Sequence, residues 1–344
     1  MKSQAITFPS GATTEFHFSA GLSDLPEVAP PPQTIIITDA NVAGLYRDQL
    51  QEYRAITFPS GEASKTLDTI AFLTKELIKA GANRNTLLIG MGGGVVTDIV
   101  GFLASVFMRG IRVAFVPTTL LAQIDAALGG KNGVNVGLYK NMLGTIRQPE
   151  FVLYDFSLLN TLPEAEWSNG FAEMIKYGYI SDPRILSTLL SSDPLFLKHH
   201  PHQLQSLIEG CADVKNKIVH ADETESGVRR ILNFGHTAGH AFETLYKIPH
   251  GHAVGLGMRV AIRLSELQTG LSNDCGVQLK QLLEKTGLPT HISFDEEAVV
   301  DLLLADKKRQ STGIEYVLLQ KPGVAITKML SAGEIRPALG VVAM

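Results

Sequence analysis

The first half of the chain alternates short apolar runs with longer amphipathic stretches. Five runs rich in β-branched and aromatic residues predict strands at 34–38, 55–58, 86–91, 113–117 and 151–154. The run at 86–91, Thr-Leu-Leu-Ile-Gly-Met, shows no polar alternation, which is typical of a strand covered on both faces. Apolar residues at helical spacing lie between the runs, for example over 64–80. This alternation predicts an α/β Rossmann-like domain with a doubly wound parallel sheet, whose ligands bind at the carboxyl ends of the strands.

The second half has a different pattern. From Pro163 onward the apolar spacing is mostly helical, over 164–180, 201–221, 238–245, 253–268 and 277–286. A chain of 344 residues is long enough for two domains, and Pro163 opens a helical run. We therefore expect a Rossmann-like NAD-binding domain over 1–162 and a mainly α-helical metal- and substrate-binding domain over 163–344.

One heptamer, Ala-Ile-Thr-Phe-Pro-Ser-Gly, occurs twice, at 5–11 and at 55–61. Two copies do not make a repeat architecture. Each copy is predicted to be a strand that runs into a turn.

The net charge and the cysteine content limit which partners and which cellular compartment are predicted. The formal net charge is −4, so neither nucleic acid nor an anionic membrane is predicted as a partner. Cys211 and Cys275 have no motif spacing and suit a reducing compartment. The amino-terminal residues lack the apolar run of a signal peptide, and no apolar segment has the length of a membrane span. A cytoplasmic protein is expected.

Four of the ten histidines lie in two short segments, Asn-Phe-Gly-His-Thr-Ala-Gly-His at 233–240 and His-Gly-His at 250–252. His236 and His240 are four residues apart, so they share one face of a helix, and this spacing favours them as a ligand pair. Glu173, on a separate predicted helix, is a third possible ligand. Two histidines and a carboxylate suit zinc with one position left open for substrate. A single buried histidine is more often a core residue, but four beside glycines favour a metal site.

A glycine-rich turn follows the third predicted strand. Gly92, Gly93 and Gly94 precede a helical pattern, where backbone N–H groups can approach a pyrophosphate. The spacing departs from G-x-G-x-x-G, because Val95 occupies the last glycine position. Acidic residues also follow the two earlier strands, and they either hold ribose hydroxyls or cap helices.

Lysines and asparagines in the next segment suit a phosphorylated substrate. Lys131 follows two glycines, and Lys140 and Asn141 form a second pair, although exposed Lys-Asn pairs are also common in turns. Arg109 ends a predicted helix, where a cation is favoured in any case.

Together these segments resemble the 3-dehydroquinate synthase family of sugar-phosphate cyclases, over roughly 38–308. The resemblance rests on motifs in a fixed order: Gly-Gly-Gly-Val-Val-Thr-Asp at 92–98, Pro-Thr-Thr at 117–119, Gly-Gly-Lys at 129–131, Lys-Asn at 140–141, Gln-Pro at 148–149, Ala-Glu-Met-Ile-Lys-Tyr-Gly at 172–178, Asp-Glu-Thr-Glu-Ser-Gly-Val-Arg at 222–229 and the histidine segment at 233–240.

The resemblance implies a metal site for zinc or cobalt and a bound NAD. Its metal ligands fall on Glu173, His236 and His250, so His240 would face the substrate instead. The implied NAD-binding positions are Asp39, Asn41, Glu62, Lys65, Gly93, Gly94, Val95, Asp98, Thr118, Thr119, Asp125, Lys140 and Thr161.

The resemblance also implies positions for the substrate. The phosphate positions are Lys131, Asn141, Asn233 and His240, and the carboxylate positions are Lys215 and Arg229. Glu225 matches a site acid, and Lys307, or its neighbour Lys308, matches a late site lysine. Arg109 matches an arginine that reaches the neighbouring subunit's substrate, which implies a homodimer.

Two departures from the family pattern stand out. Ala126 and Ala127 occupy positions where the family usually has serines, and His252 stands where it usually has glutamate. The first removes hydroxyl groups that could contact NAD, and the second places another histidine beside a ligand.

The implied activity is that of an NAD- and metal-dependent carbon–oxygen lyase. It would convert 3-deoxy-D-arabino-heptulosonate 7-phosphate to 3-dehydroquinate and phosphate, in the shikimate pathway of aromatic amino acid biosynthesis. The alternatives are another sugar-phosphate cyclase, a metal-dependent polyol dehydrogenase of the glycerol dehydrogenase type, and a non-catalytic NAD-binding or metal-sensing protein. Arg229 and Lys215 argue against a substrate without a carboxylate, and a polyol dehydrogenase would not need Lys131.

Overall fold

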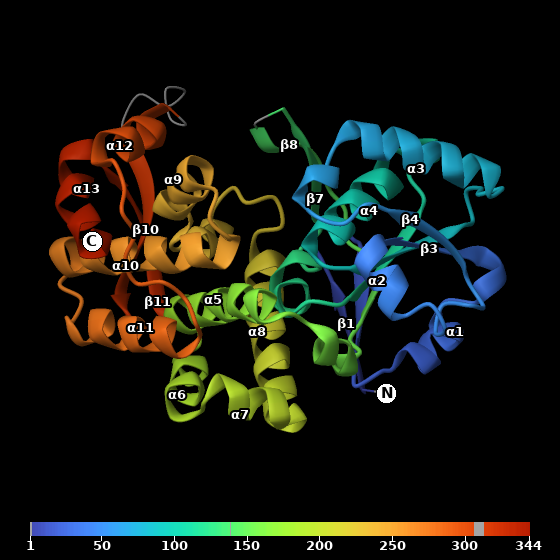
Figure 1. Cartoon of the computed structure of the whole chain (residues 1–344), viewed down its shortest axis with the longest axis horizontal. Coiled ribbons are helices and arrows are strands. Elements are labelled where there is room, and N and C mark those ends of the chain that lie inside the picture. Colours follow the sequence, from blue (N-terminus) through green and yellow to red (C-terminus); the bar gives the residue numbers. More distant parts are fainter. Residues whose placement is uncertain (1, 138, 306–312) are drawn as a thin grey trace. The chain divides into compact units, whose positions relative to one another are not determined.

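The computed structural model describes residues 2–137, 139–305 and 313–344. The chain divides into two compact units (Figure 1). The first unit comprises Met1–Pro163 and Lys215–Thr224, and the second comprises Glu164–Val214 and Glu225–Met344. Residues 215–224, which include the last turns of a long helix, thus belong to the first compact unit, and the expected domains over 1–162 and 163–344 stay a prediction.

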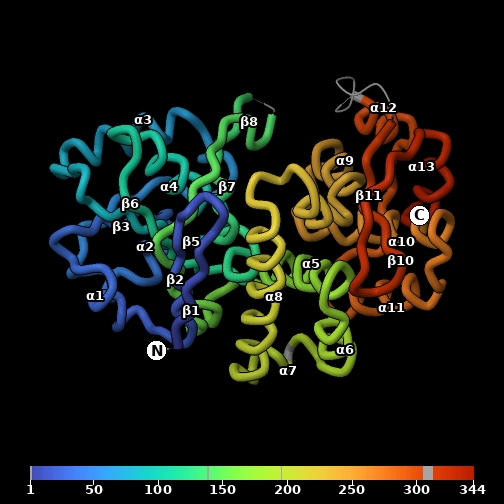
Figure 2. Tube along the Cα trace, turned by 180° about the vertical axis from the view of Figure 1, so that it is seen from behind, coloured from blue at the N-terminus to red at the C-terminus, as the bar shows by residue number. Residues whose placement is uncertain are grey.

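The first unit contains a seven-stranded sheet in the order β1-β2-β9-β6-β5-β3-β4, parallel except for the edge strand β1. All five predicted strands are confirmed, as β3 (Thr34–Asp39), β4 (Arg54–Phe58), β5 (Leu87–Gly92), β6 (Arg112–Pro117) and β9 (Phe151–Leu153). β1 (Lys2–Thr7) and β2 (Thr13–Phe18) form an antiparallel hairpin, in blue in Figure 2. Every residue of β5 is buried, as its unbroken apolar run predicted.

Helices cover both faces of this sheet. The helices of the first unit are α1 (Leu25–Val28), α2 (Ala40–Leu45), α3 (Leu67–Lys79) and α4 (Gly94–Val106). On one face, Ile36 and Ile89 join a core cluster with Val42 of α2. On the other face, Gly90 lies against Val100 of α4: a Cβ built on this glycine would be 3.2 Å from the valine Cβ. The doubly wound arrangement is thus confirmed.

The order β4-β3-β5-β6-β9 contains a topological switch point between β3 and β5. From β3 the chain crosses to β4 on one side, and the next strand, β5, returns to the other side of β3. Thr38 donates from its hydroxyl to the Met91 carbonyl at 2.7 Å, which holds the two carboxyl ends together. Ligands of open parallel sheets bind at such points.

A second hairpin in the first unit was not predicted. β7 (Lys131–Val136) and β8 (Tyr139–Ile146) pair antiparallel and pack against α4. The contact is close at Gly101, where an added Cβ would lie 1.8 Å from Asn132 Oδ1. Both copies of the duplicated heptamer are strands that run into turns, with positive φ at Gly11 (84°) and Gly61 (97°).

The second unit is mainly helical. Its helices are α5 (Glu164–Ile180), α6 (Pro183–Ser191), α7 (Pro194–His199), the first part of α8 (Pro201–Ala221), α9 (His236–Tyr246), α10 (His250–Thr269), α11 (Asp274–Lys285), α12 (Glu296–Ala305) and α13 (Ala332–Leu339). The five predicted helical stretches are all present. The hairpin of β10 (Ile314–Lys321) and β11 (Val324–Leu330) was not predicted, and its apolar side chains pack on α9 and α10. Among the described residues, no helix is long and apolar enough to cross a membrane.

Candidate metal centre and nucleotide site

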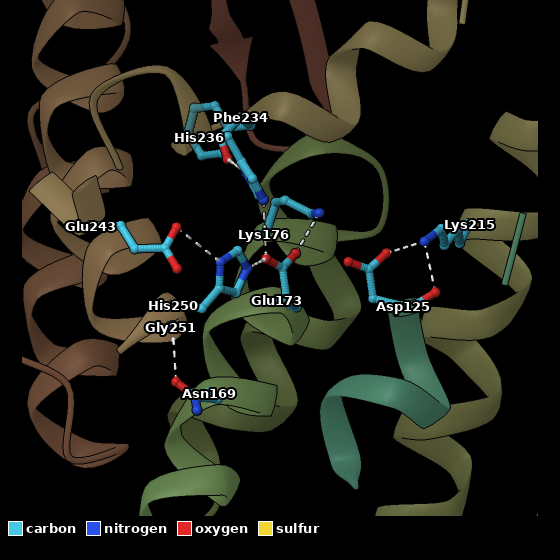
Figure 3. Close-up of polar contacts among 10 residues, drawn as sticks. All are labelled: Asp125, Asn169, Glu173, Lys176, Lys215, Phe234, His236, Glu243, His250 and Gly251. Atoms are coloured by element: carbon cyan, nitrogen blue, oxygen red, sulfur yellow. Dashed lines mark hydrogen bonds and ion pairs between the residues drawn. The ribbon is translucent and has the colours of Figure 1, made fainter. Parts of the chain in front are cut away.

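Three side chains from three helices of the second unit meet at one point (Figure 3). The Nε2 atoms of His236 and His250 lie 3.3 and 3.2 Å from Glu173 Oε1, and the possible ligand atoms all lie within 4.8 Å of one another. Glu173 is fully buried, whereas both histidines are partly exposed. Two imidazoles and one carboxylate are the donor set of open, four-coordinate zinc sites, so these residues fit a divalent metal.

Glycines bring the three helices together. Gly251, at the start of α10, packs on α5 so closely that an added Cβ would lie 2.5 Å from Asn169 Cα. Gly257 packs against the start of α9, where its Cβ would be 1.8 Å from the Gly235 carbonyl oxygen. The small residues around the histidines therefore allow backbones to approach. They place His236 and His250, each the first residue of its helix, beside the middle of α5.

Neighbouring groups orient both imidazole rings. His236 Nδ1 is 3.1 Å from the Phe234 carbonyl oxygen, to which it can donate, which leaves Nε2 as the ligand atom. Glu243 Oε2 lies 3.9 Å from His250 Nδ1, within ion-pair distance of that ring. Partners of this kind fix the tautomer and raise the basicity of a metal-bound histidine. Sequence reasoning missed Glu243, although its separation of seven residues from both histidines was a possible signal.

The electrostatics of the cluster favour an ionised Glu173. Burial by itself would raise the pKa of Glu173, but the adjacent ammonium of Lys176 and the two histidines hold that pKa well below its usual range. Burial alone would also lower the pKa of His250, but the hydrogen bond with Glu173 and the nearby carboxylate of Glu243 raise it to about 9. Lys176 is buried, forms an ion pair with Glu173 and was not predicted as a site residue.

His240 does not join this cluster. Its ring lies edge-on to that of His236, with centroids 5.3 Å apart, and the side chain is exposed. The local i, i+4 spacing therefore favoured the wrong pair, because His250 is brought in from the next helix. The ligand set implied by the family resemblance is the one that the geometry brings together.

The glycine-rich turn lies at the switch point of the sheet. Gly92 ends β5, and Gly93 is the N-cap of α4. A Cβ on Gly93 would approach Thr119 Cγ2 to 3.1 Å, and one on Gly94 would approach Ala126 Cβ to the same distance. The glycines thus allow Thr119 and Ala126 to pack closely at a helix N-terminus, the kind of position where dinucleotide pyrophosphates bind.

The predicted nucleotide residues belong to the first unit. Lys65 forms an ion pair with Asp98, and burial raises the pKa of Asp98 while Lys65 partly offsets the rise. Asp39 accepts hydrogen bonds from the Asn41 and Val42 N–H groups, so the helix-capping alternative is confirmed for this residue.

Other members of the predicted nucleotide set have partners of their own. Asp125 lies in a π-helical turn (Ala122–Ala126), and the Lys215 ammonium contacts both its carboxylate and its carbonyl oxygen, the latter at 2.7 Å (Figure 3). Lys215, predicted to bind the substrate carboxylate, therefore lies beside a predicted nucleotide residue. The Thr161 hydroxyl is 2.7 Å from that of Tyr46.

The predicted substrate residues are divided between the units. Lys131 and Asn141 are exposed on the β7–β8 hairpin of the first unit, where the Asn141 N–H donates to Asn135 Oδ1 at 2.9 Å. Asn233 belongs to the second unit and donates to Glu225 Oε1 at 3.2 Å. Arg229, also in the second unit, is buried. The assignment of Lys131, Asn141, Asn233 and His240 to one phosphate group stays a prediction, and Lys307 and Lys308 lie outside the described residues.

Backbone strain coincides with several predicted site residues. Among the described residues, six non-glycine residues have positive φ, and three of them are Arg109 (67°), Asn141 (51°) and Glu225 (61°). Such conformations are uncommon and tend to gather at functional sites.

The fold and the ligand cluster define a class of two-unit proteins in which a doubly wound sheet is combined with a helical unit that offers a two-histidine, one-carboxylate metal site. A solved structure with this fold is 2-deoxy-scyllo-inosose synthase in complex with carbaglucose-6-phosphate, NAD+ and Co2+. It is 25% identical, has a TM-score of 0.87, and is matched over 98% of this chain and 99% of its own.

Family models match most of the chain. The model of the 3-dehydroquinate synthase N-terminal region matches residues 55–169, and that of the C-terminal region matches 170–309. The 3-dehydroquinate synthase of Thermococcus kodakarensis is 40% identical over 92% of both chains. That of Dichelobacter nodosus is 42% identical over 86% of this chain and 83% of its own. The chain belongs to the 3-dehydroquinate synthase family.

Proposed function

We propose that this protein converts 3-deoxy-D-arabino-heptulosonate 7-phosphate to 3-dehydroquinate and inorganic phosphate, in the shikimate pathway. The observation that carries the proposal is the Glu173, His236 and His250 cluster, in a chain whose two halves match both family models. The residues also fit NAD, because the glycine turn lies at the switch point of the sheet, and a relative of the same fold was solved with NAD+ and Co2+. Zinc or cobalt is the proposed metal.

Bound NAD would supply a reversible hydride transfer at a ring hydroxyl, and the bound metal would lower the pKa of that hydroxyl. The protein's own part is to hold the substrate and stabilise the leaving phosphate. We assign the phosphate to Lys131, Asn141, Asn233 and His240, since charged and amide donors stabilise the negative charge that develops on elimination. Arg229 and Lys215 are assigned to the carboxylate, and Glu225 is the proposed site acid.

Lys131→Ala is expected to lower kcat about a hundredfold, because one charged contact to the leaving phosphate is worth roughly 3 kcal/mol in the transition state. Steady-state phosphate release measures the effect. Lys75→Ala, on the outer face of α3, is a matched control that should keep normal turnover. Near-normal turnover of Lys131→Ala would contradict a phosphate-binding role.

Arg229 separates the proposed substrate from those of other sugar-phosphate cyclases. Arg229 is buried, and the planar fork of its guanidinium suits a carboxylate. We expect Arg229→Ala to lose most of the wild-type preference for the heptulosonate phosphate over its carboxamide analogue. Competition assays with the two compounds measure this preference, and an unchanged ratio would favour a different carboxylate-binding residue.

A homodimer is proposed, with Arg109 reaching the partner's site. Arg109 is exposed, and its neighbours Val106 and Met108 are 46% and 40% exposed, which leaves an apolar rim for a second copy to cover. The hydrogen bond between Ser105 and Thr145 (2.9 Å) places the end of β8 beside this rim.

Mixing Arg109→Ala with Lys131→Ala under subunit exchange should therefore restore part of the activity, since each mixed dimer would contain one site with both residues intact. The measurement is turnover of the mixture compared with the sum of the two variants, with exchange followed by mass spectrometry. Full exchange without any recovery would place Arg109 in its own subunit's site.

A cytoplasmic location and a small-molecule substrate, with no nucleic acid or membrane partner, are proposed as well. The buried thiols of Cys211 and Cys275 and the net charge of −4 support them.

A further inference from the structure

Two motif residues without a role in the proposed mechanism, Gln148 and Glu223, meet in the first unit. Gln148 donates from its side-chain amide to Glu223 Oε1 at 2.9 Å. The same carboxylate accepts from the Ser10 N–H at 2.9 Å and from the Ser10 hydroxyl at 3.0 Å. Glu223 and Gln148 are each only 8% exposed. A buried carboxylate with three donors is a strong local anchor, because these bonds are shielded from water.

The turn that supplies Ser10 is the first copy of the duplicated heptamer. It is closed by hydrogen bonds from the Phe8 N–H to the Ala12 carbonyl (2.8 Å) and from the Gly11 N–H to the Phe8 carbonyl (2.9 Å). Phe8 is buried, and its ring lies 6.5 Å from that of His220 in the last turn of α8. These contacts hold the turn within the sheet unit. Through Ser10, the turn binds Glu223 in the segment that follows α8.

On its other side, Gln148 supports the loop that carries Lys131. A Cβ built on Gly130, where φ is +72°, would lie 3.0 Å from Gln148 Cδ. The Arg147 N–H donates to the Gly130 carbonyl at 2.8 Å. Gln148 thus links the Glu223 carboxylate to Gly130, which precedes the predicted phosphate-binding residue Lys131.

Glu223 also lies where the chain passes from one unit to the other. Thr224 is the last residue of its stretch in the first unit, and Glu225 is the first that belongs to the second. Glu225 has a φ of +61°, and Arg229 follows four residues later. Interactions that hold Glu223 in place therefore also hold one end of the segment that carries the proposed site acid, Glu225, and the proposed carboxylate-binding residue, Arg229.

We propose that Glu223 is a positioning residue: by binding Ser10 and Gln148 it fastens the start of the 223–229 segment within the first unit and so restrains the backbone that leads into Glu225 and Arg229. This inference rests on the proposed function for the roles of those two residues. The anchoring itself depends only on the contacts within the first unit.

The test compares Glu223→Ala with Glu223→Gln. Alanine leaves the Ser10 N–H and the Gln148 amide without their acceptor, so we expect kcat/KM for the heptulosonate phosphate to fall about tenfold and the preference for the acid over its carboxamide to shrink. Glutamine has the same shape. Its oxygen can accept from the Ser10 N–H, and its NH2 can donate to the serine hydroxyl and to a turned Gln148 amide. We therefore expect Glu223→Gln to stay within about twofold of wild type.

Asp155→Ala is the matched control for a simple loss of stability. Asp155 is also 8% exposed, lies in the first unit and accepts from three donors, the Leu22 N–H and the Ser157 N–H and hydroxyl. Its loss should lower the melting temperature as Glu223→Ala does, but leave the preference for acid over carboxamide unchanged. A Glu223→Gln variant as impaired as Glu223→Ala would overturn the proposal, because the charge itself would then be required.

Hydrogen exchange separates this inference from the proposed function. In Glu223→Ala, amide exchange over 222–229 should rise while that of α4 stays as in wild type, whether or not the protein turns over the proposed substrate. Unchanged exchange over 222–229 would overturn the anchor. A wild-type protein inactive on the heptulosonate phosphate would instead count against the proposed function alone.

Discussion

Removal of NAD should abolish release of inorganic phosphate altogether, whereas with NAD present one phosphate should appear for each carbocycle formed. The reason lies in the combination of sites: a glycine turn at the switch point of the sheet, a metal-ligand cluster and lysines suited to phosphate. A dehydrogenase needs no leaving-group site, and a phosphatase needs no NAD. Their union in one chain makes sense if the oxidation is temporary and serves to acidify the C–H bond next to the leaving phosphate.

The assay follows phosphate and NADH absorbance in one cuvette, with protein stripped of NAD and then reconstituted. No NADH should accumulate at steady state. Stoichiometric build-up of NADH would identify a polyol dehydrogenase, and phosphate release by the NAD-free protein would contradict the cyclase reaction. Turnover of a sugar phosphate without a carboxylate, in preference to the heptulosonate phosphate, would point to another sugar-phosphate cyclase.

Replacement of His250 by alanine should remove tightly bound zinc and reduce turnover by about a thousandfold or more, because two ligands cannot hold the metal that lowers the hydroxyl pKa. Glu173→Ala is expected to do the same, and it would in addition leave buried Lys176 without its carboxylate, so its melting temperature should also fall. Metal content by mass spectrometry, read beside turnover, measures both effects.

The neighbouring histidines provide the controls. His240→Ala and His252→Ala should keep their zinc, since neither residue joins the cluster. His240→Ala should still lose activity if the residue contacts the substrate phosphate. Zinc retained in His250→Ala and lost in His252→Ala would move the third ligand to His252.

The local pattern of apolar and polar residues predicted helices and strands correctly where the spacing of the apolar residues matches the faces that are buried. β5 and its neighbours were found because strands covered on both faces need continuous apolar runs, and α5 and α8 begin and end where the helical spacing does. The hairpin of β7 and β8 was missed because its sequence, rich in glycine and asparagine with an exposed second strand, is that of a loop. Its stability comes from packing on α4, which no local pattern records.

The sequence by itself determined the α/β class, the order of the motifs and the family, because apolar periods and glycine positions are local consequences of burial and backbone geometry. Local spacing alone did not decide which histidine completes the cluster: the family resemblance implied His250, and the tertiary structure brings that residue there. The i, i+4 spacing favoured His240, but the close packing of Gly251 on α5 and of Gly257 on the start of α9 brings His250 to Glu173. The tertiary structure also brings Glu223 into contact with Ser10, which is 213 residues away in the sequence. Such contacts depend on how whole helices and strands pack together. A local pattern of apolar residues cannot predict them, because the contacting side chains are far apart in the sequence.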